Sequence, residues 1–537
     1  MRERLAALGF RATLETFRGR IDLPEHIFLE LDNRSGGATK RFDLREGTGG
    51  SDPDAGRPDA VLPFNYGSGD GDVRAPYVYA NRGLDADYAA LRAHGVAVRG
   101  AIVLVRYGAE FRGFLAARAA RNGAAGVIFY SDPRDDGAAR GPVYPRGSWR
   151  PLDSVQRGTV SGTPLRIPTL PVTMLTAAKL LAYVPHASGR YGRSSRVLHL
   201  VVKLERRQAT MWNTIGVLPG RTAQEVILGG HRDAWVYGVT DNGAGISTLL
   251  EVAKSFAALA RTGWRPERTV VIAGWDAEEI GALGSQAYVA AHRADLRAHG
   301  VAYLNADENV TGPAFASDAV AAIGNTVVRA ADDLRIPAVP LFADTPGGGS
   351  DHESFLFGLG MPIAEVGYQG HLGVYHSSYD DIGYATKEID PGFRLHEKAA
   401  RILGLVALRL ADDPSLPYAF VPYVNVLQEA RAALGPADDP LLRPLDRSIE
   451  TFALAAAAYD ARRASVRGEG RQRDVIAAAQ TLDLTLYGAA GYASAFFPAI
   501  ARASTTQDGS ARAAAIQSAA AALDSVAASL NRADTAS

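Results

Sequence analysis

Acidic and histidine side chains collect at four places in the middle of the chain, each directly after a run of apolar residues. These groups are the ligands that zinc and related divalent metals use in proteins, and carboxylates also carry protons in acid–base catalysis. The four clusters are His231, Arg232, Asp233 and Asp241; Asp276, Glu278 and Glu279; Asp307 and Glu308; and His371, His376, Asp380 and Asp381. Such residues point to a metal site that activates a water and polarises a carbonyl or phosphoryl group.

The elements between the clusters predict how the clusters are arranged. Short apolar runs ("EVILGG", "RTVVIAG", "GVAYLNAD", "MPIAEVGY") alternate with helical segments such as "GAGISTLLEVAKSFAALARTG" and "SQAYVAAHRADLRAHG". This alternation is typical of a mainly parallel sheet with helices on both faces, the α/β class. The carboxyl ends of parallel strands share one edge, where ligands bind. We therefore expect the clusters to converge, although they extend from residue 231 to residue 381.

So many carboxylates in one crevice need a counter-charge, which divalent metal ions supply. The chain has no cysteine, so thiolate ligands and disulfides are excluded. Nitrogen and oxygen ligands favour zinc, with manganese or cobalt as alternatives. One possible arrangement is a carboxylate that bridges two metals about 3.5–4 Å apart, with one histidine and one acid on each side. Neighbouring side chains diverge in a loop, so Glu279 can be a ligand while Glu278 takes a proton from the water.

Each cluster taken alone has a simpler explanation. The sequence 231–233 is common in surface turns and helix caps, although Asp233 could also orient the ring of a ligand histidine as a hydrogen-bond acceptor. His371 or His352 could be the ligand in place of His376. Only the convergence of all four clusters supports a metal site.

The other polar motifs also have structural explanations that need no ligand. Asp307 alone could be a helix N-cap. The acid pairs at 332–333, 380–381 and 412–413 are typical of solvated loops or caps. The "GGGS" sequence at 347–350 lacks the ending of a phosphate-binding loop, so it indicates a flexible turn.

Composition limits the class of protein and its partners. At 537 residues the chain is too long for one core, and two to four domains are expected. A formal net charge of −1 gives no basis for binding nucleic acid or an anionic membrane. No apolar run approaches the roughly 20 residues of a spanning helix, so no membrane segment is expected. The first residues, "MRERLAALGFRATLETF", have helical periodicity without the apolar core of a signal peptide. We expect a periplasmic or secreted location if an export signal precedes Met1, and a cytoplasmic one otherwise.

Changes of pattern along the chain predict three domains. The α/β domain comprises residues 1–60, which include the strand-like "HIFLEL", together with residues 205–411. An inserted domain, residues 61–204, contains a β-α-β unit in "GAIVLVRYG", "RGFLAARAARNGA" and "GVIFYSD". From residue 412 to residue 537 alanine and leucine dominate with helical periodicity, which predicts a helical bundle packed on the core or on a second subunit.

The motifs "GGHRDAWVYGVTDNGAG", "GWDAEEIGALGS", "LNAD" and "VYHSSYDD" resemble, in order and spacing, the di-zinc exopeptidases of the glutamate carboxypeptidase II and transferrin receptor family. "VRYGAEFRG", "GVIFYSDP" and "VQRG" resemble that family's protease-associated (apical) domain, and "GYASAFFPAI" its helical dimerisation domain. The resemblance implies a zinc exopeptidase fold, a small peptide substrate and a homodimer.

The resemblance also implies a complete set of ligands for two zinc ions. One zinc would be held by His231, Asp241 and Asp307, and the other by Asp241, Glu279 and His376. Glu278 would be the general base and acid, Asp233 would orient His231, and the Asp241–Asn242 peptide bond would be cis. Transferrin receptors have lost zinc ligands, whereas every position is filled here, which disfavours a non-catalytic receptor-like binding protein.

In the glutamate-releasing relatives an arginine and two tyrosines grip the free α-carboxylate of the substrate. Arg112, Tyr375 and Tyr492 match these positions, which favours a carboxypeptidase. The alternatives are an aminopeptidase on the same zinc site, and a structural role for the three residues as a surface arginine and packing aromatics.

Other specificity positions of the family are changed. Gly491 replaces the lysine that senses glutamate, and Glu365 and Gly367 stand where paired arginines favour an acidic penultimate residue. Strict glutamate specificity is therefore not expected, although Arg150 could keep some tolerance of acidic side chains. Ala287 and Ala290 replace acids of the family's structural calcium site, so no calcium is predicted.

Overall fold

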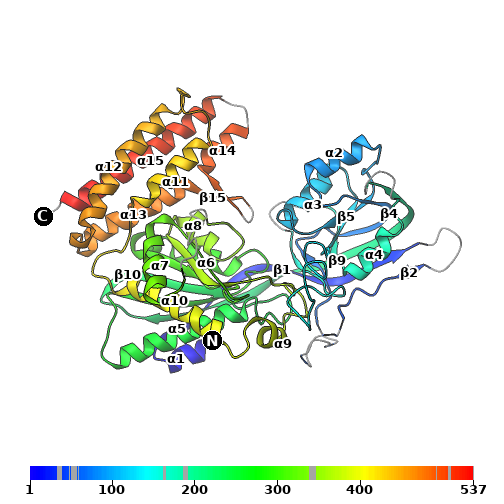
Figure 1. Ribbon diagram of the computed structural model, residues 1–537, viewed down its shortest axis with the longest axis horizontal. Helices are drawn as coiled ribbons and strands as arrows, with labels where there is room; N and C mark the ends of the chain where they lie inside the picture. The colour runs from blue at the N-terminus through cyan, green and yellow to red at the C-terminus, as the bar shows by residue number, and fades with distance from the viewer. Residues whose placement is uncertain are drawn as a thin grey trace.

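The computed structural model of the chain shows an α/β region, a second β-rich region beside it and a bundle of helices packed on the first (Figure 1). The structure describes residues 1–537 except 33–38, 48, 50, 51, 53–56, 58, 59, 161–164, 186–190, 338–345, 491, 492, 506–508, 536 and 537.

One sheet of twelve strands runs through the α/β region and the β-rich region. Its strands are β1 (Arg11–Leu31), β2 (Lys40–Arg41), β4 (Gly71–Tyr79), β5 (Ile102–Arg106), β6 (Gly126–Tyr130), β8 (Thr169–Pro171), β9 (Arg193–Leu218), β10 (Thr222–His231), β11 (Arg268–Trp275), β12 (Gly300–Asn305), β13 (Ala314–Ala319) and β14 (Ile363–Gln369). The order is β13-β14-β12-β10-β11-β9-β4-β5-β6-β8, with β1 paired to β9 and to β2. The 26-residue β9 pairs with β4 near its start and with β11 near its end, so it joins the two regions.

The half of the sheet that carries the four polar clusters is mainly parallel, as predicted. Strand β10 is parallel to β11 and β12, and β14 is parallel to β12. The flanking strands are antiparallel: β13 to β14, and β9 to β11. Its helices are α5 (Gly243–Arg261), α6 (Leu283–His299), α7 (Ala321–Asp333), α8 (His352–Leu359), α9 (Ile382–Tyr384) and α10 (Arg394–Asp412). Helix α10 packs on α5 and α7, and α6 packs on α8, so helices cover both faces of this half. The apolar strands are buried because both faces are covered.

The β-rich region contains the predicted β-α-β unit as β5, α3 (Arg112–Arg121) and β6. Strands β4, β5, β6 and β8 are parallel here. The region also contains α2 (Asp85–Ala93), α4 (Met174–Leu181) and the short pair β3 (Asn65–Tyr66) and β7 (Gly158–Thr159). The expected boundary between residues 204 and 205 lies within β9, because this strand continues from one region into the other. The domain limits stay predictions.

The beginning of the chain differs from the helix that its periodicity predicts. Helix α1 (Arg2–Ala7) is only six residues long, and β1 begins at Arg11 and pairs with β9 along its length. Gly9, at φ +94°, follows the cap residue Leu8 and ends the helix before β1 begins. The sequence "RATLETF" also alternates in polarity, and pairing with the long β9 selects the extended conformation over the helix.

The C-terminal region is helical, as predicted. Its elements are α11 (Pro422–Ala432), α12 (Arg443–Arg462), α13 (Glu469–Leu486), α14 (Pro498–Thr505), α15 (Gly509–Thr535) and a hairpin of β15 (Tyr487–Ala490) and β16 (Ala493–Phe496). One expectation is corrected here, because the stretch Gly509–Ala533 of α15 is long and apolar enough to cross a membrane by length and composition. In the fold, α15 packs on α12 and α13, and Leu523 and Leu530 lie in the core. A core helix passes the same test, so the criterion alone is weak support for a membrane span.

Candidate metal centre

The two predicted ligand histidines face the same carboxylate. His231 is the last residue of β10, and His376 lies on the loop after β14. Nε2 of His231 is 3.1 Å from Oδ1 of Asp241, and Nε2 of His376 is 3.1 Å from Oδ2. Asp241 precedes α5, so both of its oxygens are shared between imidazoles that are far apart in sequence.

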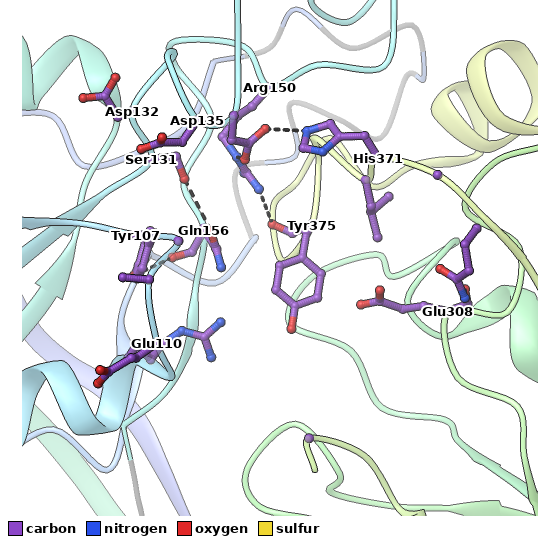
Figure 2. Close-up of a pocket in the computed structure, with 18 of the residues that line it drawn as sticks. Tyr107, Glu110, Ser131, Asp132, Asp135, Arg150, Gln156, Glu308, His371 and Tyr375 are labelled. Carbon is purple, nitrogen blue, oxygen red and sulfur yellow. Dashed lines mark hydrogen bonds and ion pairs between the residues drawn. The ribbon is translucent and has the colours of Figure 1, made fainter. Parts of the chain in front are cut away.

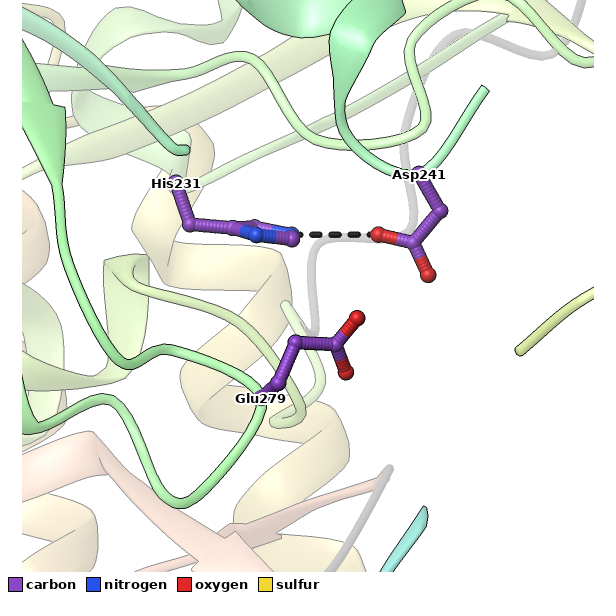
Figure 3. Close-up of side chains that lie close together, drawn as sticks. All are labelled: His231, Asp241 and Glu279. Carbon is purple, nitrogen blue, oxygen red and sulfur yellow. Dashed lines mark ion pairs between the residues drawn. The ribbon is translucent and has the colours of Figure 1, made fainter. Parts of the chain in front are cut away.

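A second carboxylate completes each side of this arrangement. Oδ1 of Asp307, just beyond β12, is 3.0 Å from Nε2 of His231. Oε2 of Glu279, just beyond β11, is 3.1 Å from Nε2 of His376. Figure 3 shows Asp241 directed at His231, with Glu279 beside both. One ligand atom from each of these three residues lies within 4.8 Å of the other two.

The far nitrogen of each imidazole is held by a main-chain carbonyl. Nδ1 of His231 is 2.9 Å from the carbonyl oxygen of Asp233, and Nδ1 of His376 is 3.0 Å from that of Arg157. A carbonyl only accepts, so Nδ1 carries the hydrogen in both rings. Nε2 of each neutral ring then presents its lone pair to the carboxylates, which requires a proton or a metal ion between them.

The loop of Asp241 is held on both sides. Asp380 accepts the main-chain N–H groups of Thr240 (2.9 Å) and Asp241 (3.0 Å). The predicted cis peptide bond between Asp241 and Asn242 is present. The Asn242 side chain donates to the carbonyl of Ala306 and accepts the N–H of Gly245 in the first turn of α5. These contacts tie the end of β10 to the end of β12.

Buried charge dominates the electrostatics of the centre. Burial raises the pKa of Glu279 to about 7, and raises that of Glu278 well above its ordinary value. Burial alone would lower the pKa of His231, but Asp307 and Asp241 outweigh it and raise this pKa. Burial would raise the pKa of Asp241, but His231 and His376 lower it. A divalent cation held between these imidazoles and carboxylates would supply the counter-charge that the buried acids require.

The residues fit zinc. A tetrahedral zinc with bonds of about 2.0–2.1 Å separates neighbouring ligand atoms by roughly 3.3 Å, close to the separations seen here. The donor set is imidazole and carboxylate, and Oε1 of Glu279 is buried with no hydrogen-bond partner among the described residues. An unpartnered buried oxygen at this point is available to a cation.

Two cavities open beside the centre. The first, about 930 Å³, is lined by Asp307, Glu308, His352 and Glu365 and is named the Glu365 cavity (Figure 2). The second, about 1030 Å³, is lined by Phe111, Glu278, Ile280 and Leu283 and is named the Glu278 cavity. Arg112, Ser350 and Tyr375 line both.

The predicted substrate-binding residues reach this space to different extents. Arg112, at the start of α3, is buried and lines both cavities. Tyr375 lines both cavities, and its ring and hydroxyl are directed away from Arg150 (Figure 2). Arg150 donates to Asp136, to Ser154 and to the carbonyl of Tyr375. Tyr492 lies outside the described residues.

Comparison with known proteins identifies the family. A family model of the PA domain matches residues 73–180, and that of peptidase family M28 matches residues 213–391. The "Probable glutamate carboxypeptidase AMP1" of Arabidopsis thaliana is 30% identical over 522 residues, which cover 88% of this chain and 72% of that protein. The chain belongs to peptidase family M28.

The names of other similar proteins specify an aminopeptidase instead of a carboxypeptidase. The rat "Aminopeptidase NAALADL1" is 29% identical over 496 residues, with 75% of this chain and 66% of that protein covered. Two solved structures share the fold: a peptidase M28 precursor from Shewanella amazonensis (TM-score 0.56, 19% identity, 77% and 87% coverage) and the zinc aminopeptidase of Bacillus subtilis (0.54, 18%, 76% and 87%). The family and the metal centre together identify this chain as a zinc metallo-exopeptidase.

Neither alternative histidine lies at the M28 metal centre. His371 contacts Asp136 (Nε2 to Oδ1, 2.8 Å) and stacks on Trp149. His352 is bonded through Nε2 to the carbonyl of Gly347, on the wall of the Glu365 cavity.

Two residues that hold the proposed metal ligands in place were not predicted from the sequence. Asp380 was predicted to lie in a solvated loop, but it is buried under Asp241. Its position four residues after the predicted ligand His376 could have indicated a supporting role. Ser350, read as part of a flexible turn, donates to Oδ2 of Asp307 at 2.6 Å and accepts from Asn305 at 2.9 Å. Nothing local to the "GGGS" sequence indicated this contact.

Proposed function

We propose that the chain is a di-zinc carboxypeptidase that releases the C-terminal residue of small peptides without a strict requirement for glutamate. The observation that carries the proposal is the sharing of Asp241 between two imidazole–carboxylate sets. His231, Asp241 and Asp307 would hold one zinc, and Asp241, Glu279 and His376 the other. When bound, the two ions would supply Lewis acidity to the scissile carbonyl and lower the pKa of a water at the site.

Glu278 is assigned the proton transfers. It lines the cavity next to the proposed ligand Glu279, and burial raises its pKa, which brings a carboxyl group toward the range useful at neutral pH. Its carboxylate would accept a proton from the attacking water and then donate it to the leaving amine. The leaving residue therefore occupies the Glu278 cavity.

Arg112 and Tyr375 support the choice of peptide end. A guanidinium and a phenol hydroxyl are suited to a carboxylate, and both side chains line the Glu278 cavity, where the leaving residue would lie. A free C-terminal carboxylate bound there would place the preceding peptide bond at the metal centre. Tyr492 is proposed as the third contact.

End-blocked peptides test this choice. The zinc-loaded protein is incubated with an N-acetylated dipeptide that has a free carboxylate, and with the C-amidated dipeptide of the same sequence with a free amine. We expect release of the C-terminal amino acid from the acetylated peptide only. Cleavage of only the amidated peptide would assign the site to an aminopeptidase, and turnover of neither would favour a binding protein.

A further inference from the structure

Five arginines line the Glu365 cavity, and three of them pair with aspartates of the same cavity. The pairs are Arg82–Asp135 at 2.7 Å, Arg134–Asp132 at 2.5 Å and Arg150–Asp136 at 2.5 Å. The other two are Arg112, which also lines the Glu278 cavity, and Arg140, whose guanidinium lies 5.7 Å from the centre of the Trp149 ring. The three paired arginines are thus poorly placed to bind an anionic substrate group.

Glu365 has no such partner. It lies on β14, its side chain is 26% exposed, and the described residues place no Lys or Arg nitrogen within 4.0 Å of its carboxylate. Among the described residues its carboxylate accepts one hydrogen bond, a long one from the Asn305 side chain, at 3.4 Å. Burial raises the pKa of Glu365 to about 8, and Asp307 adds to this effect. No Lys or Arg of the described residues therefore supplies a counter-charge to this carboxyl group.

His352 adds a second acceptor. Its Nε2 is 2.7 Å from the carbonyl oxygen of Gly347, so this nitrogen carries a hydrogen and donates it; in the tautomer with hydrogen on Nε2 only, Nδ1 presents a lone pair. The side chain is only 8% exposed, and Nδ1 has no hydrogen-bond partner among the described residues. Nδ1 lies 3.9 Å from Oε2 of Glu365. The partly exposed carboxyl group of Glu365 and the buried Nδ1 of His352 thus lie close together on the cavity wall, and the described residues place no Lys or Arg nitrogen within 4.0 Å of the carboxyl group.

The direction of the peptide decides which residue meets these acceptors. The leaving residue lies on the Glu278 side, because Glu278 must donate a proton to the departing amine. The residue before the scissile bond then lies on the other side of the centre. Asp307 lines that side, in the Glu365 cavity.

We infer that the Glu365 cavity selects a positively charged group, an ammonium or a guanidinium, on the residue that precedes the scissile bond. This inference rests on the proposed carboxypeptidase function. One such group carries several N–H donors, so it can donate to Glu365 and to His352 together and also neutralise the carboxylate. The group can be a Lys or Arg side chain, or the free α-ammonium of a dipeptide.

Four substrates with C-terminal leucine test the inference on the zinc-loaded protein. They are N-acetyl-Lys-Leu, N-acetyl-norleucyl-Leu, N-acetyl-Glu-Leu and norleucyl-Leu with a free amine. We expect kcat/KM to be roughly 10-fold or more higher for a peptide with the cation than for N-acetyl-norleucyl-Leu, and lowest for the glutamyl peptide. The lysyl and free-amine arms tell which cation is selected. Equal values for all four, or a preference for glutamate, would overturn the inference.

A substitution tests whether Glu365 causes the preference for the cationic substrate. Glu365→Gln keeps the size of the side chain and should bring the ratio of the cationic to the norleucyl substrate close to 1. Glu397→Gln, on the exposed surface of α10, is the matched control and should keep the wild-type ratio. An unchanged ratio in Glu365→Gln would also overturn the inference.

Binding separates failure of this inference from failure of the proposed function. Calorimetry with zinc-loaded Glu278→Gln measures the Kd of N-acetyl-Lys-Leu, norleucyl-Leu and N-acetyl-norleucyl-Leu without turnover. Tighter binding of a cationic peptide, lost on adding Glu365→Gln, supports the subsite even if the wild type hydrolyses none of the peptides. Equal affinities overturn it, whatever the activity.

Discussion

The Asp233 carboxylate accepts the main-chain N–H of Glu278, with 3.1 Å between Asp233 Oδ1 and Glu278 N. Its other oxygen accepts the N–H of Glu279 at 3.2 Å. The main-chain carbonyl of the same residue accepts from Nδ1 of His231, while its carboxylate lies 3.7 Å from that nitrogen. Asp233 thus touches His231 through its main chain, and its side chain holds the loop that carries the proposed base.

Asp233→Asn should reduce activity without unfolding the chain. The amide that replaces one oxygen is a donor, so one of the two loop N–H groups loses its acceptor. We expect kcat to fall by about 10- to 100-fold, the usual effect of losing support behind a metal site. Steady-state kinetics measures kcat, and circular dichroism checks that the variant stays folded. Asp276→Asn is the control, because Asp276 accepts the N–H of Trp212 instead. Equal losses in both variants would contradict the role of Asp233.

Glu278→Gln should keep the metals and lose turnover. The amide has nearly the same shape but cannot accept the proton of the attacking water, and a general base typically contributes about 10²- to 10⁴-fold. The measurements are zinc per chain by elemental analysis and hydrolysis of an N-acetylated dipeptide. Glu251→Gln, on the exposed face of α5, serves as the control. Normal hydrolysis by Glu278→Gln would exclude this residue as the base.

Asp241→Asn should disturb both metal positions at once. The two oxygens of Asp241 face different imidazoles, so losing the charge and one acceptor oxygen weakens both sides. We expect zinc content after gel filtration to fall from about two ions per chain to below one. Zinc at 1,000 times its Kd stabilises a fold by about 4 kcal/mol, so the thermal midpoint of the variant should approach that of the chelator-treated wild type. Two tightly held ions in this variant would disprove a bridging role.

Asp483→Asn should change how stability depends on pH. Asp483 lies on α13, is completely buried and accepts from the Tyr423 hydroxyl at 2.6 Å. Burial raises the pKa of Asp483 well above its ordinary value, and the bond from Tyr423 offsets only part of the rise. Above about pH 4 the unfolded chain loses this proton while the folded chain keeps it, so the free energy of unfolding falls as pH rises toward the folded pKa.

The asparagine variant lacks this dependence and keeps an acceptor for Tyr423. Its stability relative to the wild type should therefore increase between pH 5 and pH 8, by up to about 1.4 kcal/mol per pH unit. Urea unfolding at both pH values measures the change. Asp474→Asn, exposed on the same helix, is the control. Parallel pH profiles for Asp483→Asn and the wild type would refute the prediction.

The sequence by itself predicted the parallel half of the sheet and the convergence of its polar clusters. Apolar runs and helical periodicity are local patterns, and the strand direction that follows from them places His231, Asp307 and Glu279 at one edge. The cis bond at Asp241 was also predicted, from the family resemblance of its motif.

Only the tertiary structure decided what supports these residues. That Asp380 lies beneath Asp241 and Ser350 beside Asp307 depends on chain segments far apart in sequence. The same is true of β1, whose extended form comes from pairing with β9, where the paired residues are 167 to 206 positions apart along the chain. Such contacts depend on packing and on burial of polar groups, which local patterns do not encode. The uncompensated Glu365 became visible in the same way, because a missing counter-charge is a property of the space around a residue.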